Sequence, residues 1–287
     1  AQVSLMLKAS RIEGKGRACL AARDISKGNV LLFEAPLLCA AHSDATHACS
    51  TCLDDACSVC DSCREGICLA CSPHVCRGYS QSELEIRQSI WYRLYEKYVN
   101  LLLDEHDLDT TPTDWSAFAR VPADVYEGWD KFTAAAEDIF VQPLWKRLEG
   151  RVRDGTPASQ ALTLTGFLDF YRLARANAAA ISNRGSAIFK IHACLNHACN
   201  ANAMAVSLLD LPAFAEHVGS KAHRSSIVVF AQRDIAANEE VCINYLEEAE
   251  TCEELRKRYG FECVCEKCAA ERKDQPGDVR STTGHSA

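Results

Sequence analysis

Three cysteines lie within six residues near the end of the chain, in the order Cys263-Val-Cys265-Glu-Lys-Cys268. Thiolates at this spacing favour zinc, which takes four protein ligands when its role is structural. The best candidate for a fourth ligand is Cys199, far upstream. Spacing alone does not force this choice over the three other cysteines near these two segments, Cys194, Cys242 and Cys252. One shared metal ion would fasten the end of the chain to the segment around Cys199.

A second cysteine-rich stretch covers residues 49–76 and offers nine candidate ligands, Cys49, Cys52, Cys57, Cys60, Cys63, Cys68, Cys71, His74 and Cys76. If pairs alternate, as they do in cross-braced modules, one zinc takes Cys49, Cys52, Cys68 and Cys71. The other takes Cys60, Cys63, Cys76 and either His74 or Cys57. The stretch has too little apolar bulk to fold without metal, so we expect metal binding to supply its folding energy.

The distribution of the seventeen cysteines indicates zinc rather than disulfides. They gather in paired knuckles, and the first residues carry too short an apolar run for a signal peptide. We therefore expect a reducing compartment, the nucleus or the cytoplasm. Hydrophobic residues make up 48% of the chain without a run long enough to span a membrane, so we expect no membrane association.

The formal net charge of −8 disfavours direct nucleic-acid binding. An acidic protein is better suited to basic partners such as lysine-rich peptides.

The hydrophobic pattern predicts strands, then helices, then strands again. The first strands are expected at Val3–Lys8, Ala18–Ala22 and Asn29–Glu34. Helices are expected at Ser82–Asp104, 114–120, 129–148 (bent or split by Pro143) and 165–180. Later strands are expected at Ala203–Leu209, Ile227–Gln232 and Glu240–Tyr245, followed by a helix at 249–258. From Lys273 the composition predicts disorder.

Four ordered motifs resemble those of SET-domain lysine methyltransferases. Asn196-His197-Ala198-Cys199-Asn200-Ala201-Asn202 is similar to the family's Asn-His signature, and Val241-Cys-Ile-Asn-Tyr245-Leu to its tyrosine-bearing strand. Tyr259-Gly-Phe261-Glu-Cys263 and the cysteines after it resemble the zinc-binding post-SET segment. Lys15-Gly16-Arg17 through Phe33-Glu34-Ala35-Pro36-Leu37 is similar to the opening strands. The cysteine cluster after that opening resembles the SET-and-MYND (SMYD) branch, in which a MYND zinc module interrupts the SET domain.

The resemblance implies an α+β fold of small β-sheets with an inserted MYND-like zinc module, a helical insert and a post-SET segment. The implied divisions are 1–48 and 161–250 for the SET domain, 49–76 for the zinc module, 77–160 for the helical insert, 251–270 for the post-SET segment and 271–287 for a disordered tail. Only nineteen residues follow Cys268, so we expect no C-terminal helical-repeat domain of the kind found in several SMYD relatives.

The resemblance also implies a function, methyl transfer from S-adenosylmethionine to lysine side chains of proteins, histone or non-histone. Tyr245 and Tyr259 would be catalytic, Tyr259 as a wall of the lysine channel. The implied cofactor site is Lys15, Gly16, Asn177, Asn196, His197, Tyr245 and Phe261, and the implied post-SET zinc ligands are Cys199, Cys263, Cys265 and Cys268.

Departures from the family pattern leave a second hypothesis open. Ala198, Ala201 and Ala179 stand where serine, proline and a channel aromatic are usual. A SET fold that no longer catalyses, acting as an interaction module that binds a peptide partner through its MYND-like zinc stretch, is therefore the alternative. A thiol enzyme that uses Cys194 with His192 or His197 is a weaker one, because nothing in the sequence orients such a pair.

Overall fold

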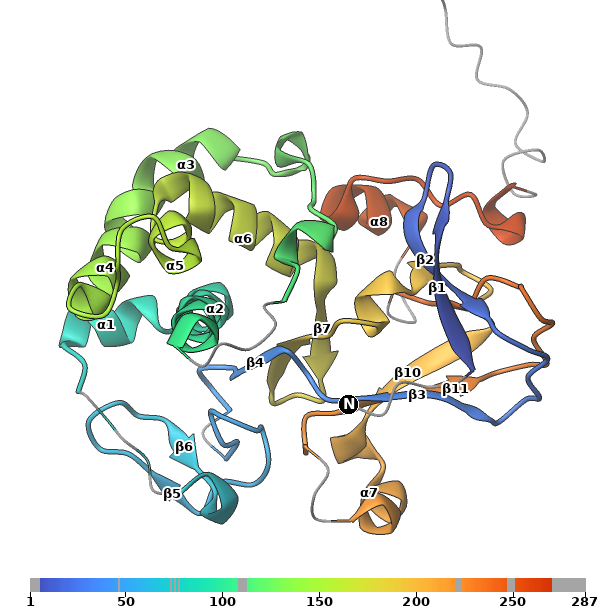
Figure 1. Ribbon diagram of the computed structural model, residues 1–287, viewed down its shortest axis with the longest axis horizontal. Coiled ribbons are helices and arrows are strands. Elements are labelled where there is room, and N and C mark those ends of the chain that lie inside the picture. The colour runs from blue at the N-terminus through green and yellow to red at the C-terminus, as the bar shows by residue number, and fades with distance from the viewer. Residues whose placement is uncertain are drawn as a thin grey trace, which may run out of the picture.

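The strands of the described residues form several small sheets, and a group of helices lies beside them (Figure 1). The computed structural model describes residues 6–45, 47–72, 74, 76, 78–107, 113–219, 223–246 and 251–269, with backbone alone for 105–107. Within these ranges, no helix combines the length and apolar character that a membrane crossing requires.

An N-terminal hairpin pairs β1 (Leu7–Ile12) with β2 (Gly16–Ala21) in antiparallel register. The turn between them uses glycines with positive φ, Gly14 at 74° and Gly16 at 78°, a backbone conformation that glycine adopts at little cost. The first strand is predicted at Val3–Lys8, and the structure has it at Leu7–Ile12. Residues 3–5 of the predicted strand lie outside the described part. The hairpin carries Lys15 at its tip.

Two three-stranded sheets form the body of the fold. In the first, β11 (Ile227–Ala231) lies between β10 (Ala203–Ser207) and β3 (Val30–Glu34), and all three are rich in β-branched or other apolar residues. In the second, β8 (Gly185–Ile188) lies between β4 (Leu38–Ala41) and β7 (Ala178–Ile181). Gly185 permits the close approach of β4, since a Cβ there would lie 2.2 Å from the Ala40 carbonyl oxygen.

A short parallel pair joins β9 (Asn196–His197) to β12 (Cys242–Ile243). Asn196 lies opposite Cys242, and His197 lies opposite Ile243. The expected strand Glu240–Tyr245 is thus regular only over Cys242 and Ile243. This pairing brings the Asn-His loop beside the segment that ends in Tyr245, although the two are far apart in sequence.

The MYND-like stretch is built mainly from loops. Its regular elements are β5 (Ser58–Val59), β6 (Gly66–Ile67) and the 3₁₀ turn η1 (Leu69–Cys71). Buried cysteines themselves form its small core, Cys49, Cys52 and Cys68. Such a core has little apolar area to bury, which agrees with the expectation that metal ligation stabilises this stretch.

Helices occupy one side of the molecule (Figure 1). They are α1 (Gln81–Ile86), α2 (Ile90–Asp107), α3 (Trp129–Ala136), α4 (Gln142–Leu148), α5 (Pro157–Ala161) and α6 (Leu164–Asn177). The apolar face of α2 buries Leu94, Tyr95 and Val99 completely. The ring of Tyr95 packs edge-on against Phe167 of α6, with ring centroids 4.9 Å apart. This aromatic core makes the helical insert a substantial folding unit.

The predicted helices differ from expectation in form. Ser82–Asp104 is interrupted between α1 and α2, and 165–180 ends at Asn177, after which β7 begins. The stretch 129–148 is divided by a π-helical turn, η4 (Glu137–Val141), because Pro143 in the next turn cannot donate to the carbonyl four residues before it. The stretch 114–120 forms only the 3₁₀ turn η2 (Trp115–Ala117). The guanidinium of Arg120 there donates to the carbonyls of Trp115 and Phe118, which a longer helix would have used for itself.

The remaining helical elements are distributed over the rest of the molecule. They are η3 (Ala123–Val125), η5 (His192–Cys194), η6 (Leu208–Asp210), α7 (Pro212–Val218) and α8 (Cys252–Tyr259). Helix α7 lies far from the hairpin tip and α8 lies close to it (Figure 1). Helix α8 covers most of the helix expected at 249–258, whose first two residues lie outside the described part. It contacts α6 and η3, so the post-SET segment rests on the helical insert. The predicted tail, 271–287, also lies outside the described residues.

Candidate methyltransferase site

The terminal cluster consists of Cys199, Cys263, Cys265 and Cys268, whose sulfur atoms all lie within 4.8 Å of one another. Cys199 Sγ is 3.4 Å from Cys268 Sγ and 3.8 Å from Cys263 Sγ. Four thiols at such distances suit a tetrahedral zinc with Zn–S bonds of about 2.3 Å. Cys199 therefore joins Cys263, Cys265 and Cys268, as the sequence predicts, and these closing cysteines lie beside the Asn-His loop.

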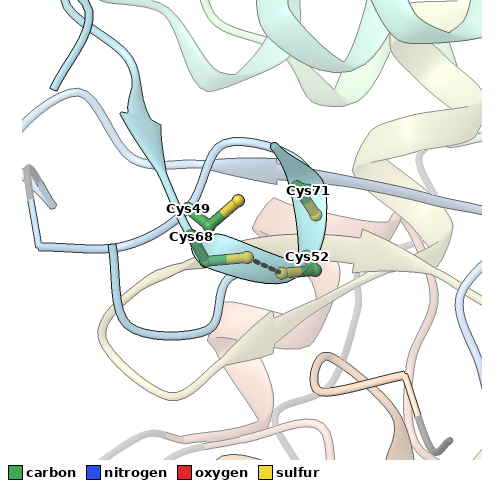
Figure 2. A group of neighbouring side chains, drawn as sticks. All are labelled: Cys49, Cys52, Cys68 and Cys71. Carbon is green, nitrogen blue, oxygen red and sulfur yellow. Dashed lines mark hydrogen bonds between the residues drawn. The ribbon is translucent and has the colours of Figure 1, made fainter. Parts of the chain in front are cut away.

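The cysteines of the MYND-like stretch divide into two clusters. The first module cluster is Cys49, Cys52, Cys68 and Cys71, shown in Figure 2, and the second is Cys60, Cys63, His74 and Cys76. This is the alternating pattern expected from sequence. Between the two candidates for the last ligand, the structure selects His74, whose Nε2 lies 3.2 Å from Cys63 Sγ. Cys57 is exposed, and its thiol donates to the Ile67 carbonyl instead.

Asn196 and Lys15 meet at the carboxylate of Glu240. The Asn196 amide donates to Glu240 Oε1 at 2.8 Å, and the Lys15 ammonium donates to Glu240 Oε2 at 2.6 Å. This hydrogen bond with Glu240 raises the pKa of Lys15, so the ammonium stays charged. The hairpin tip, the Asn-His loop and the segment before β12 therefore form one polar junction.

His197 lies between the terminal cluster and Tyr245. Its Nδ1 accepts the backbone N–H of Tyr245 at 3.0 Å, and its Nε2 lies 3.3 Å from Cys199 Sγ. The tautomer that satisfies both contacts carries its proton on Nε2. Burial lowers the pKa of His197 to about 4, so the ring is neutral at neutral pH. It contacts the candidate ligand Cys199 in the way that outer partners orient ligands at known metal sites.

Tyr245 has its hydroxyl fixed and its ring surrounded by aromatic side chains. The hydroxyl donates to the Leu195 carbonyl at 2.5 Å. The ring centroids of Tyr259 and Phe261 lie 5.2 and 6.4 Å from that of Tyr245. Burial raises the pKa of Tyr245 well above its usual range, so the phenol stays protonated and can orient groups but cannot act as a base.

Glu34 holds the segment that leads into the Asn-His loop, a role that the sequence motifs did not reveal. Its carboxylate accepts the backbone N–H groups of Lys190, Ile191 and His192 at 2.8–2.9 Å. Only 6% of Glu34 is exposed, and this burial raises the pKa of its carboxyl against the opposing effect of the three N–H donors. The available signal for this role was a charged residue at the end of the otherwise apolar strand Val30–Glu34.

A cavity of about 220 Å³ lies where these groups meet. Its lining residues are Gly14, Lys15, Asn196, His197, Tyr245, Phe261, Glu262, Cys263 and Val264. Ligand pockets usually measure about 300–1,000 Å³, so a nucleotide-sized molecule would extend beyond it. The wall combines an ammonium, an amide and the partly exposed ring of Phe261, which suit a carboxylate, an amine and an aromatic base respectively.

Three residues that the resemblance assigns to the site do not line this cavity. Asn177 is buried at the end of α6, where its amide donates to the carbonyls of Ala119 and Leu173. Gly16 lies one residue beyond Lys15 at the start of β2. Tyr259 does not line the cavity itself, but its ring packs against those of Tyr245 and Phe261, which do. Their assigned roles stay predictions.

A larger hollow of about 560 Å³ lies between the MYND-like stretch and the helical insert. Most of its charged groups are paired with one another. Arg87 binds both Glu65 and Glu96, and Arg147 lies 3.9 Å from Glu96. The larger size of this hollow does not make it the candidate site. The convergence of the predicted residues favours the 220 Å³ cavity instead.

The thiol-enzyme alternative finds no support in the arrangement of its residues. The hydrogen bond with Cys19 lowers the pKa of the Cys194 thiol to about 7, and Cys194 also contacts the Lys190 carbonyl. Both ring nitrogens of His197 are engaged by Tyr245 and Cys199. A nucleophile requires a base within hydrogen-bond reach. His197 does not serve Cys194 in this way, and the Nδ1 atom of His192 has no hydrogen-bond partner in the described part of the chain.

The fold and site define a protein of the SET-domain class, and the comparison with family models agrees. The SET domain family matches residues 16–246, so the chain belongs to this family. Histone-lysine N-methyltransferase SET5 of Scheffersomyces stipitis is 29% identical over 225 residues, covering 71% of this chain and 43% of that protein. Protein-lysine N-trimethyltransferase SMYD5 of Mus musculus is 33% identical over 100 residues, covering 31% of this chain and 20% of that protein.

Among solved structures, the SET domain of LSMT bound to lysine and AdoHcy has a TM-score of 0.46 at 16% identity, covering 92% of this chain and 54% of that one. The chain spans less than half the length of the SET5 and SMYD5 relatives.

Proposed function

We propose that the chain binds S-adenosylmethionine in the 220 Å³ cavity and transfers its methyl group to a lysine side chain of a protein. The observation that carries this proposal is the position of Tyr245. Its hydroxyl is fixed to the Leu195 carbonyl, in a wall that the Asn-His loop, the hairpin tip and the post-SET segment build together. The SET5 and SMYD5 relatives are named for this class of reaction.

The cofactor would supply a methyl group on a sulfonium, and the chain's residues would bind and align it. Lys15 would pair with its carboxylate, Asn196 would contact its amino group, and Phe261 would lie against its base. The exposed fractions of the Lys15 side chain and of Phe261, 36% and 37%, leave these two groups accessible to such a ligand.

The catalytic contribution of the chain would be alignment and exclusion of water. Methyl transfer to an amine needs no covalent enzyme intermediate, so holding donor and acceptor in line can provide much of the acceleration. The rings of Tyr245 and Tyr259 would flank the lysine stem. A lysine in water has a pKa of about 10.4, and exclusion of water from around the amine would lower it and favour loss of the proton before transfer. The Tyr245 hydroxyl and the Leu195 carbonyl would orient the acceptor amine.

Zinc would be structural at all three clusters, because each offers four protein ligands and leaves no open position. The terminal cluster, Cys199, Cys263, Cys265 and Cys268, would hold the wall segment 261–264 against the cavity. The two module clusters would fold the MYND-like stretch. Zinc thiolates fit a reducing compartment, and we propose the nucleus or the cytoplasm.

The substrate we propose is a lysine-containing protein, a histone among the candidates, because the SET5 relative is named a histone-lysine methyltransferase. Calorimetry of the zinc-loaded chain with S-adenosylmethionine tests the proposal, followed by mass spectrometry of proteins from a lysate incubated with cofactor labelled in its methyl group. Saturable binding with labelled methyl groups on lysines is expected. A chain that binds no cofactor overturns the proposal.

The exposed apolar side chains of the MYND-like stretch favour a second activity, binding of a peptide partner. Leu69 and Val59 are 82% and 47% exposed, and both lie outside the cavity wall. One outcome is a chain that binds no cofactor but captures a partner, with that capture abolished by Leu69→Asp. In that case the inactive interaction module is the correct description.

A further inference from the structure

A fifth cysteine, Cys252, lies against the terminal cluster without belonging to its four-ligand set. It is the first residue of α8, and its Sγ lies 3.1 Å from Cys268 Sγ and 3.4 Å from Cys199 Sγ. With the 3.4 Å between Cys199 and Cys268, the three sulfur atoms form a nearly equilateral triangle. The 3.1 Å contact is shorter than either measured distance between Cys199 and its partner ligands.

The position of Cys252 differs from that of the ligand beside it. Cys268 is 3% exposed, whereas Cys252 is only half-buried. If zinc occupies the four-ligand set, Cys252 is the thiol left over. A free, accessible thiol in contact with a buried one is the arrangement in which a first oxidised sulfur is rapidly captured by a second.

We propose that Cys252 is an oxidation site, and that a hydroperoxide links it to Cys268 in a disulfide that expels the zinc. The two sulfurs need to approach by only about 1 Å to reach the disulfide bond length of about 2.05 Å. Cys268 is favoured over Cys199 as the partner because its sulfur is the nearer of the two. Cys268 also belongs to the same post-SET segment, 251–270, as Cys252, whereas Cys199 does not.

The step balances with the peroxide as the only oxidant. The Cys252 sulfur attacks a peroxide oxygen, the O–O bond breaks, and an alcohol or water leaves while Cys252 becomes a sulfenic acid. The Cys268 sulfur then attacks that sulfur and displaces water. The two sulfurs together lose two electrons to the peroxide. The two molecules that leave, an alcohol or water and then water, take up one proton from the Cys252 thiol and one from solvent. Zinc leaves as Zn²⁺ because Cys268 is no longer a thiolate.

One consequence rests on the proposed function. Phe261, Glu262, Cys263 and Val264 line the cavity on the chain segment between α8 and Cys268. Loss of the metal would free this segment from Cys199 and remove one wall of the cavity. Oxidation of Cys252 would therefore abolish cofactor binding, which a reductant together with zinc would restore.

The test uses the full zinc-loaded chain, hydrogen peroxide and non-reducing peptide mapping. Trypsin separates the relevant cysteines, because Cys268 lies in 268–272, Cys263 and Cys265 lie in 259–267, and Cys252 lies in 234–256. A linkage between 234–256 and 268–272 is expected, with release of one zinc from the terminal cluster. Because 234–256 also contains Cys242, Cys252→Ser decides which sulfur is linked, and it should abolish this linkage.

The matched control is Cys57→Ser, which removes an exposed thiol that lies outside all three clusters. This variant should form the linkage as the parent chain does. Oxidation of Cys57 in the parent shows that the peroxide dose is sufficient. At that dose, an absent linkage, a bond from Cys268 to Cys263 or Cys265, or equal zinc release from the parent and Cys252→Ser overturns the inference. Linkage and zinc release are measured without cofactor, so a failure to bind S-adenosylmethionine would contradict only the proposed function.

Discussion

The Nδ1 atom of His197 accepts a hydrogen bond from the backbone N–H of Tyr245 at 3.0 Å. The same ring contacts Cys199 Sγ through Nε2, so one side chain connects a metal ligand to the tyrosine that lines the cavity. Stability of the terminal cluster and geometry of the cavity are thereby linked. Single substitutions at Tyr245 and at His197 can therefore test methyl transfer and metal binding separately.

Replacing Tyr245 by phenylalanine should impair methyl transfer while leaving cofactor binding nearly unchanged. The change removes only the hydroxyl that donates to the Leu195 carbonyl and keeps the ring against Tyr259 and Phe261. Removing a group that orients the reacting atoms typically lowers kcat about 10²–10³-fold. Rates with labelled cofactor and calorimetric affinities check this. An unchanged rate would remove Tyr245 from the proposed mechanism.

Replacing His197 by alanine should weaken zinc binding at the terminal cluster. The Cys199 sulfur would lose its imidazole partner, and such outer contacts are worth about 10–100-fold in metal affinity. Competition with a chromophoric chelator measures the effect. His217→Ala, on the exposed face of α7, is the control and should bind zinc as the parent does. If both variants hold zinc equally well, the ring does not support the metal site.

Replacing Glu34 by alanine should destabilise the fold by about 1–3 kcal/mol, because three partly buried backbone N–H groups lose their acceptor. Glu34→Gln keeps one acceptor oxygen and should lose less. Urea unfolding followed by tryptophan fluorescence gives the two free energies, and Glu216→Gln on the exposed surface of α7 is the reference. Equal stability of Glu34→Ala and the parent would contradict the anchoring role.

Acid should destabilise the chain partly through His192. Burial lowers the pKa of this imidazole from 6.5 to about 4, so the unfolded chain binds a proton there before the folded chain does. The stability it contributes is complete above pH 6.5 and is lost as the pH falls toward 4. At about 1.4 kcal/mol per pKa unit, the loss approaches about 3 kcal/mol. His192→Gln should flatten this part of the stability–pH profile relative to the parent, and His217→Gln should leave it unchanged.

Removal of zinc should unfold the MYND-like stretch before the helical insert. The stretch has a core of cysteines, whereas the insert packs against α6 through fully buried rings such as Tyr95 and Phe167. Hydrogen exchange of the chelator-treated chain should show lost protection around β5 and β6, with α2 and α6 still protected. Protection that stays equal in both regions would show that the stretch folds without metal.

The metal clusters and the central motifs could be read from sequence because their determinants are local. A C-x-C-x-x-C places three sulfurs on one ion almost regardless of the surrounding fold, and alternating knuckles limit the pairing of the rest. The Asn-His loop and Tyr245 meet because β9 and β12 pair, a single long-range contact that the shared cysteine site already required.

Other parts of the site depend on packing that no spacing encodes. Asn177 belongs to a motif-like stretch, but the end of α6 turns its amide toward the carbonyls of Ala119 and Leu173. The role of Glu34 comes from three backbone N–H groups more than 150 residues away in sequence. Cys252 was one of several cysteines that spacing left open, and only the start of α8 brings it beside Cys268.

The pairing of β9 with β12 sets an order of assembly during synthesis. Residues 196 and 197 leave the ribosome well before 242 and 243, and the wall at 261–264 follows later still. Nascent chains can therefore complete the aromatic helical unit early, but the cavity must wait until residues 261–264 have been made. Termination between Ile243 and Phe261 would leave a chain whose described sheets can form but whose cavity lacks its closing side.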